Sequence, residues 1–141
     1  MNASKEKTIL FICTGNSCRS QMAEGFARKI LPANWRVFSA GTIAAGIHPL
    51  TIEVMKEAGV DISDQRSKTI EDVPVKQVDH VVTLCGDAHE RCPVFPNARS
   101  KEHWPVEDPN MATSGPDPMV VFRRVRDDIC QRIEELADRI T

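Results

Sequence analysis

The residues with the clearest chemical potential lie in one short stretch, CTGNSCRS, at positions 13–20. Cys13 supplies a thiol, and Arg19 supplies a planar cation that can hold two oxygens of an anion at once. The residues between them are small, so their backbone N–H groups can surround a tetrahedral oxyanion; they are Thr14, Gly15, Asn16, Ser17 and Cys18. The positive field that binds such an anion also favours the thiolate of Cys13, which is the nucleophilic form. The stretch therefore predicts a loop that binds an oxyanion and attacks it.

A second cysteine followed six positions later by an arginine occurs in CGDAHER, residues 85–91. This loop contains Asp87 and Glu90, whose carboxylates would repel an oxyanion, so it does not predict a second anion site. Cys13 and Cys85 each follow an apolar run typical of a strand, and parallel strands end at one edge of a sheet. We therefore expect Cys85 to lie close to Cys13.

Apolar patterns predict the elements that carry these loops. Short runs at 8–13, 35–41, 80–84 and 101–106 are typical of strands, and helical patterns mark 20–31, 49–59 and the segment from Pro118 onward. In that last segment the apolar residues recur at steps of three and four: Phe122, Val125, Ile129, Ile133, Leu136 and Ile140. Strands that alternate with helices predict an α/β fold with a parallel, doubly wound sheet. With 141 residues, the chain is expected to form a single domain, 1–141.

Charge and composition argue against several classes of partner. The net charge is −2 and no run of Lys or Arg is present, so we expect no nucleic acid partner. No stretch approaches the roughly 20 apolar residues of a membrane span, and TILFIC near the N-terminus is too short for a secretion signal. The five cysteines are an odd number, and reduced thiols tend to be catalytic, redox-active or metal-binding. We therefore expect a cytoplasmic protein with no membrane partner.

The longer stretch CTGNSCRSQMAEG resembles the phosphate-binding loop of the low-molecular-weight tyrosine phosphatase superfamily, and most closely its arsenate reductase branch. Three further features of this chain resemble the same branch: Cys85 followed by Cys92, HWPVEDP at 103–109 and FRRVRDDI at 122–129. The resemblance implies a single-domain, three-layer α/β sandwich with a four-stranded parallel sheet. It also implies reduction of arsenate to arsenite, with thioredoxin as the electron donor.

The resemblance implies a role for each residue of the site. Cys13 is expected to be the nucleophile, Arg19 the oxyanion clamp, and Ser20 a hydroxyl donor to the thiolate. Asp108 is expected to be the general acid that protonates the departing oxygen. No cofactor and no metal ion are expected at the catalytic site, and the protein is expected to be a monomer.

Cys85 and Cys92 are implied to form the redox relay that follows the attack. If residues 86–92 are helical, the Cα atoms of the two cysteines are about 10.5 Å apart, whereas a disulfide needs roughly 4.4–6.8 Å. Gly86, Asp87 and His89 are poor helix formers, and Pro93 ends any helix there. The sequence therefore predicts a redox switch, in which this segment opens when the disulfide forms.

Two other functions remain open. A phosphatase of the same fold would need only Cys13, Arg19 and Asp108, although the phosphatase branch usually has proline where this chain has Gln21. That branch also usually has tyrosines beside its general acid, and this chain contains no tyrosine. A non-catalytic protein could instead bind an oxyanion in the loop or arsenite between cysteines. Taken without the resemblance, Cys13 could be a buried core residue and Asp108 could simply start a turn.

An accessory site also departs from the implied pattern. Some reductases of this type bind a potassium ion beside the loop, at positions that correspond to Asn16, Glu24, Ser39 and a further acidic residue. The last position is Lys68 in this chain. Its ammonium would repel a cation, and we expect it to pair with Glu24 in place of the ion.

Overall fold

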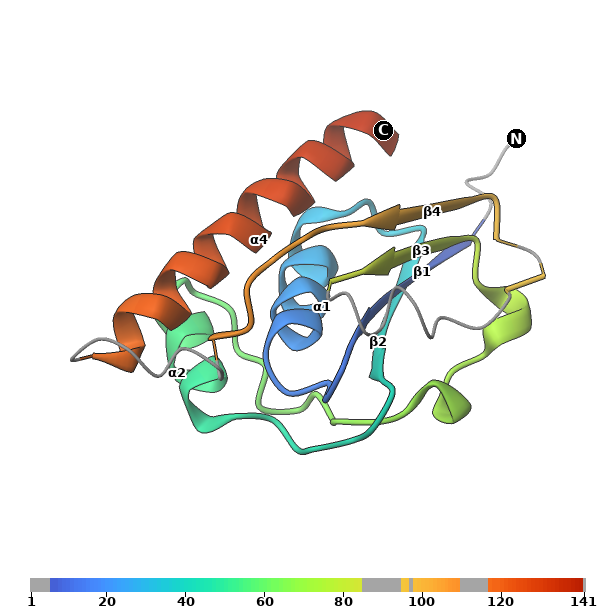
Figure 1. Cartoon of the computed structure of the whole chain (residues 1–141). Coiled ribbons are helices and arrows are strands. Elements are labelled where there is room, and N and C mark those ends of the chain that lie inside the picture. The colour runs from blue at the N-terminus through green and yellow to red at the C-terminus, as the bar shows by residue number, and fades with distance from the viewer. Residues whose placement is uncertain (1–5, 85–94, 97, 110–116, 141) are drawn as a thin grey trace.

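The computed structural model describes residues 6–84, 95–96, 98–109 and 117–140 (Figure 1). The elements follow one another in the order β1 (Lys7–Cys13), α1 (Arg19–Ile30), β2 (Trp35–Gly41), α2 (Pro49–Glu57), the 3-10 helices η1 (Ile70–Asp72) and η2 (Val75–Gln77), β3 (His80–Thr83), β4 (Ser100–His103) and α4 (Pro118–Ile140).

The four strands form one parallel sheet in the order β2-β1-β3-β4. This arrangement confirms the predicted α/β fold with a four-stranded parallel sheet. The central strand β1 is buried from Thr8 to Cys13, as its continuous apolar run predicts for a strand covered on both faces. Because all strands run in one direction, Cys13, Gly41 and Thr83 end on the same edge of the sheet.

The predicted fourth strand, 101–106, is too long, because β4 ends at His103. The N–H of Trp104 still donates to the carbonyl of Thr83, but the N–H of Val106 turns back to the carbonyl of Trp104. The chain therefore leaves the sheet after β4, and this turn leads it toward the carboxyl edge of the strands.

Helix α1 packs on β1 and β2, and α4 packs along α1 (Figure 1). The predicted apolar stripe of α4 is confirmed, because Phe122, Val125, Ile129, Ile133 and Leu136 are buried. Ile140, the last residue of that stripe, is only partly buried. None of the helices in the described ranges combines the length and the apolar character needed to cross a membrane.

Gly41 ends β2 where another chain segment passes very close. A Cβ atom at this position would lie 2.3 Å from the Ile43 carbonyl oxygen and 2.7 Å from the backbone N of Asn16. These contacts are with backbone atoms, which cannot move aside as the end of a flexible side chain can. The absence of a side chain at Gly41 therefore lets β2 and its following loop pack against residues 14–16.

His80 begins β3 at the opposite edge of the sheet and is 8% exposed. Its Nε2 lies 2.8 Å from Oε2 of Glu102 on β4. Burial lowers the pKa of the His80 imidazole, and the attraction of Glu102 offsets only part of this effect. The neutral ring is therefore favoured in the folded protein, and protonating it costs stability.

Candidate active site

The loop that leaves β1 after Cys13 enters α1 at Arg19, so the nucleophile candidate lies at a strand end and the arginine lies in a first helical turn. Cys13 is 2% exposed, and its Sγ lies 2.9 Å from Oγ of Ser20. A cavity of about 150 Å³ lies above them, lined by Cys13, Thr14, Gly15, Ser17, Cys18, Arg19, Ala45 and Asp108. The structure therefore gathers most of the predicted site residues around one small cavity.

A larger hollow of about 380 Å³ lies at the opposite edge of the sheet, beside Lys7, Trp35 and His80. None of the described residues that line it is a cysteine. The smaller cavity is the better candidate site because it holds the thiol, the arginine and the carboxylate together.

Arg19 is 6% exposed and its guanidinium is partly anchored. Its NH1 donates to the carbonyls of Leu84 and Val106, at 3.3 and 3.1 Å. Its NH2 lies 3.4 Å from Oδ2 of Asp108. Within the described part of the chain, its buried Nε has no hydrogen-bond partner. A buried N–H without a partner is costly, and an anion in the adjoining cavity would satisfy it.

Asn16 holds the loop in its unusual shape, with a φ of 49° in the left-handed region. Its Nδ2 donates to Ser20 Oγ at 2.7 Å and to Ser39 Oγ at 3.0 Å. Its Oδ1 accepts from Gln21 Nε2 at 2.9 Å and from the backbone N–H of Lys68 at 2.8 Å. With both donors and both acceptor positions used, Asn16 offsets the strain of its backbone and keeps the loop preorganised.

The backbone of the loop is also held from one side. The carbonyls of Thr14, Gly15 and Ser17 accept hydrogen bonds from N–H groups of the segment 42–48. These oxygens are therefore directed at the neighbouring segment, and an anion in the cavity would not meet their negative charge. The arrangement suits a tetrahedral oxyanion next to the helix N-terminus.

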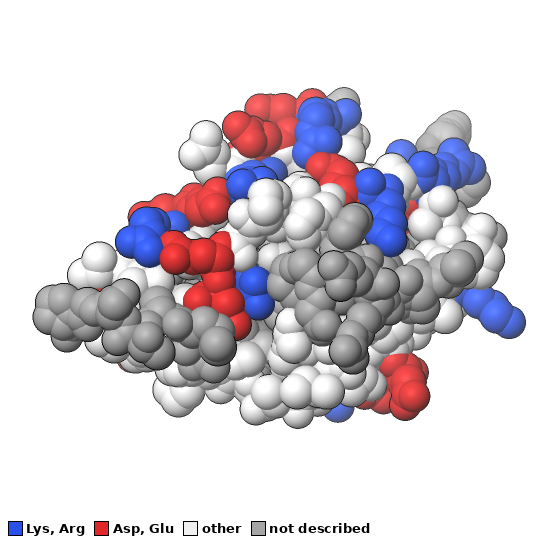
Figure 2. Space-filling model, in the orientation of Figure 1, with Lys and Arg blue, Asp and Glu red and all other residues white. Residues whose placement is uncertain are grey.

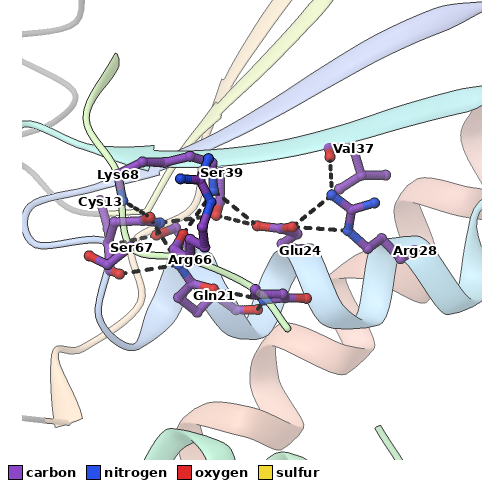
Figure 3. A network of polar contacts seen from close by, with 12 residues as sticks. Cys13, Gln21, Glu24, Arg28, Val37, Ser39, Arg66, Ser67 and Lys68 are labelled. Atoms are coloured by element: carbon purple, nitrogen blue, oxygen red, sulfur yellow. Dashed lines mark hydrogen bonds and ion pairs between the residues drawn. The ribbon is translucent and has the colours of Figure 1, made fainter. Parts of the chain in front are cut away.

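The polar network beside the loop confirms the predicted pairing of Lys68 with Glu24 (Figure 3). Glu24 is 2% exposed, and its Oε1 lies 3.7 Å from Nζ of Lys68 and accepts a hydrogen bond from Ser39 at 2.5 Å. Its Oε2 is paired with Arg28 at 2.8 Å. Burial lowers the pKa of Lys68, although Glu24 opposes that shift. Because an ammonium and a guanidinium already flank Glu24, these residues do not fit a potassium ion.

Cys18 and Cys130 differ from Cys13 in their surroundings. Cys18 is buried beside the cavity, and burial raises the pKa of its thiol. Cys130 lies on α4, is partly buried against the core, and its pKa is also raised, chiefly by burial. A raised pKa disfavours the thiolate, so neither Cys18 nor Cys130 is suited to act as a nucleophile.

Cys85 and Cys92 lie outside the described residues, and so does the segment 86–92 predicted to be a redox switch. Leu84 is the last described residue before them, and its carbonyl accepts the hydrogen bond from Arg19. Leu84 therefore lies next to the arginine of the cavity, and the expected closeness of Cys85 to Cys13 stays a prediction.

Sequence reasoning missed several contributors to this site. Ala45 lines the cavity, and Gln65, Arg66 and Ser67 touch the loop or the first turn of α1. Their sequence separation from Cys13 hides them, because no local pattern links residues more than thirty positions apart. Gln21 was a local signal of these contacts, because the phosphatase branch usually has proline at this position and an amide needs hydrogen-bond partners.

The chain is also similar to several known proteins. Residues 8–141 match the family model described as low molecular weight phosphotyrosine protein phosphatase. Arsenate reductase 2 of Staphylococcus epidermidis is 50% identical over 134 residues, which cover 95% of this chain and 98% of that protein. A solved structure described as an arsenate reductase in the phosphate binding state has a TM-score of 0.83 and 38% identity, and covers 96% of this chain and 99% of its own.

A thioredoxin-dependent arsenate reductase of Corynebacterium glutamicum is a further structural relative. Its TM-score is 0.75 at 31% identity, with 99% of this chain and 64% of that chain covered. Together these similarities confirm the predicted resemblance and the phosphatase-like fold.

Proposed function

Because the chain belongs to the low molecular weight phosphotyrosine protein phosphatase family, we propose that it works as an arsenate reductase with Cys13 as its nucleophile. The observation that carries the proposal is the cavity of about 150 Å³ in which Cys13, Arg19 and Asp108 meet. A thiol beside a hydroxyl donor, facing a buried guanidinium, is suited to attack on a bound tetrahedral oxyanion. Curated relatives that are 50% and 48% identical to this chain carry the name arsenate reductase.

In the first step, the Cys13 thiolate attacks arsenic in an arsenate held by the loop and by Arg19. A sulfur–arsenic bond forms, an arsenic–oxygen bond breaks, and Asp108 supplies the proton with which that oxygen leaves as water. The short distance of 3.4 Å between Asp108 and Arg19 NH2 supports this role, because it puts the carboxyl group beside the anion clamp. Ser20 Oγ, at 2.9 Å, stabilises the thiolate before the attack.

In the second step, the Cys85 thiolate attacks Sγ of Cys13. The Cys13 to Cys85 disulfide forms, and the sulfur–arsenic bond breaks with its electron pair remaining on arsenic, which leaves as arsenite. The Cys92 thiolate then attacks Cys85, so a Cys85 to Cys92 disulfide forms and Cys13 is released as a thiolate. Two electrons have passed from the cysteines to arsenic, and the protein carries one disulfide.

Thioredoxin is the proposed donor that reduces this disulfide and completes the cycle. The relative from Corynebacterium glutamicum is described as thioredoxin-dependent, which supports this assignment. The relay needs reduced thiols at its start, and the reducing cytoplasm provides that condition. We further propose that residues 1–141 act as one domain and as a monomer, since a single chain supplies Cys13, Arg19 and Asp108 to the cavity and so needs no residue from a partner there.

A phosphatase activity is a second candidate, because the same loop would hold a phosphate group and the family model is that of a phosphatase. It would use Cys13, Arg19 and Asp108, with water in place of Cys85 as the second attacking group. We propose it as a weak side activity, since a chain with the full relay needs no hydrolysis to release its product.

The test measures arsenate-dependent oxidation of NADPH in the presence of thioredoxin and thioredoxin reductase. Parallel assays replace that pair with glutathione and glutaredoxin, or replace arsenate with p-nitrophenyl phosphate. Cys13→Ser is the inactive control, and a variant with Cys85 and Cys92 both replaced by serine separates the relay from the loop.

We expect thioredoxin-coupled turnover of arsenate that exceeds phosphomonoester turnover, and its loss in both variants. The double variant should keep any phosphatase activity. Faster turnover of p-nitrophenyl phosphate than of arsenate would favour the phosphatase. Stoichiometric binding of arsenate or arsenite, with no turnover with any donor, would favour a non-catalytic binding protein.

A further inference from the structure

Gln21 lies in the first turn of α1, is fully buried, and takes part in none of the reaction steps above. Its Nε2 donates to Asn16 Oδ1 at 2.9 Å and to the Arg66 carbonyl at 3.0 Å (Figure 3). Its Oε1 accepts from Nε2 of Gln65 at 2.7 Å. The amide of Gln21 is therefore held in one orientation, since its nitrogen faces acceptors and its oxygen faces a donor.

Gln21 and the backbone of Lys68 together orient a second buried amide, that of Asn16. Because Oδ1 of Asn16 accepts from Gln21 and from the backbone N–H of Lys68, its Nδ2 must point the other way. There it gives its two hydrogens to Ser20 Oγ and Ser39 Oγ. Rotating the Asn16 amide would place its oxygen against these hydroxyls and its nitrogen against two donors.

The direction of these hydrogen bonds decides which group donates to the nucleophile, Cys13. Ser20 Oγ accepts a hydrogen from Asn16, so the hydrogen of Ser20 itself is available for Cys13 Sγ at 2.9 Å. A hydroxyl that donates to sulfur stabilises the thiolate relative to the thiol. At the side branch, Ser39 gives its own hydrogen to Glu24 and thereby accepts from Asn16 without competition.

We propose that Gln21, oriented by Gln65, is a positioning residue that makes Ser20 a hydrogen-bond donor to the Cys13 thiolate. The inference rests on the proposed function, since it assigns Cys13 the role of nucleophile. The order of the bonds is Gln65, Gln21, Asn16, Ser20 and Cys13, and each bond favours the direction of the next. Gln21 does not touch the oxyanion or the sulfur.

The experiment replaces Gln21 with an isosteric acceptor. In Gln21→Glu, a carboxylate oxygen replaces the donor to Asn16 Oδ1, and of the two donors to that oxygen only the Lys68 N–H remains. We expect the carboxylate to attract Asn16 Nδ2 and turn the amide, so that Ser20 donates to Asn16 instead of Cys13. The readout is the rate at which iodoacetamide alkylates Cys13, followed by peptide mass spectrometry across a range of pH. Gln131→Glu, on the exposed side of α4, controls for the added charge.

We expect the midpoint of the Cys13 alkylation profile to rise by about one pH unit in Gln21→Glu, which is about tenfold less thiolate at a fixed pH below the midpoint. Gln131→Glu should keep the midpoint of the unmodified protein. In a Ser20→Ala background, Gln21→Glu should cause no further shift, because the bond it redirects is already gone. A merely structural role of Gln21 would not produce this dependence on Ser20.

An unchanged midpoint in folded Gln21→Glu, or an equal shift with and without Ser20, would overturn the proposal. If Gln21→Glu does not fold, Gln65→Ala decides. It removes the donor to Gln21 Oε1 and so weakens the hold on that amide; we expect a smaller rise of the midpoint, whereas no rise rejects the proposal. Alkylation needs no arsenate. The profile therefore reports on this bond order even if the protein proves not to reduce arsenate.

Discussion

Lys68→Ala tests whether the protein carries its own cation beside the anion loop. Nζ of Lys68 lies 3.7 Å from Oε1 of the buried Glu24. At an effective dielectric constant near 20 the attraction between them is about 4 kcal/mol. Part of it is offset by the cost of burying the ammonium, which also lowers the Lys68 pKa, and Arg28 still neutralises Oε2 of Glu24 in the variant.

The net loss expected for Lys68→Ala is therefore about 1–2 kcal/mol of unfolding free energy, or roughly 3–6 °C in melting temperature. The vacated position can then accept an external cation, so part of the loss should return with potassium or sodium. At a cation concentration ten times Kd, such binding restores about 1.4 kcal/mol. The unmodified protein should show no such response.

The assay follows melting temperature and arsenate turnover in potassium, sodium and choline chloride at one ionic strength of about 0.1 M, where screening is equal. Lys56→Ala, which removes an exposed lysine on α2, is the matched control and should change neither quantity. A potassium-specific rise in the unmodified protein would show that the accessory cation site is intact. An unchanged melting temperature in Lys68→Ala would show that the ion pair with Glu24 contributes nothing.

Four further results are expected. Cys13→Ser should abolish arsenate reduction, because a serine hydroxyl is hardly ionised at neutral pH. Cys92→Ser should complete one turnover and then stall as a Cys13 to Cys85 disulfide, which peptide mapping would detect. Sustained thioredoxin-coupled turnover by Cys92→Ser would remove Cys92 from the mechanism. Hydrogen exchange across residues 86–95 should differ between the reduced protein and its oxidised form, and equal protection in both would exclude the redox switch. Burial lowers the pKa of His80, so as pH drops the imidazole is protonated in the unfolded chain before it is protonated in the folded protein, and the free energy of unfolding should fall below about pH 6.5. Urea unfolding of His80→Gln should lack that part of the pH dependence. An identical fall in both proteins would contradict this role of His80.

On the face of the molecule drawn in Figure 2, Lys and Arg lie among Asp and Glu, and neither sign of charge dominates. This matches the net charge of −2 and the absence of a basic run in the sequence. We therefore expect recognition of an oxyanion to depend on the local field of Arg19 and the loop and not on a long-range positive surface.

Much of the fold followed from patterns that act over a few residues. The apolar runs of β1 and β2 and the stripe of α4 predicted strands and a helix whose bounds the structure reproduces closely. The last strand was less well predicted, because SKEH has no apolar alternation and β4 forms only by pairing with β3. β4 ends where the chain turns toward Arg19, and the position of this turn depends on tertiary contacts.

The sequence by itself determined the chemistry of the loop, because Cys13, Arg19 and Ser20 are local neighbours at a strand-to-helix junction whose geometry hardly varies. Only the tertiary structure placed Asp108 beside Arg19, Ala45 at the cavity and Gln65 against Gln21. The physical reason is distance along the chain. Periodicity reports which face of an element is buried, whereas the meeting of residues from separate elements is set by how the connections between strands close and by which buried polar groups find partners.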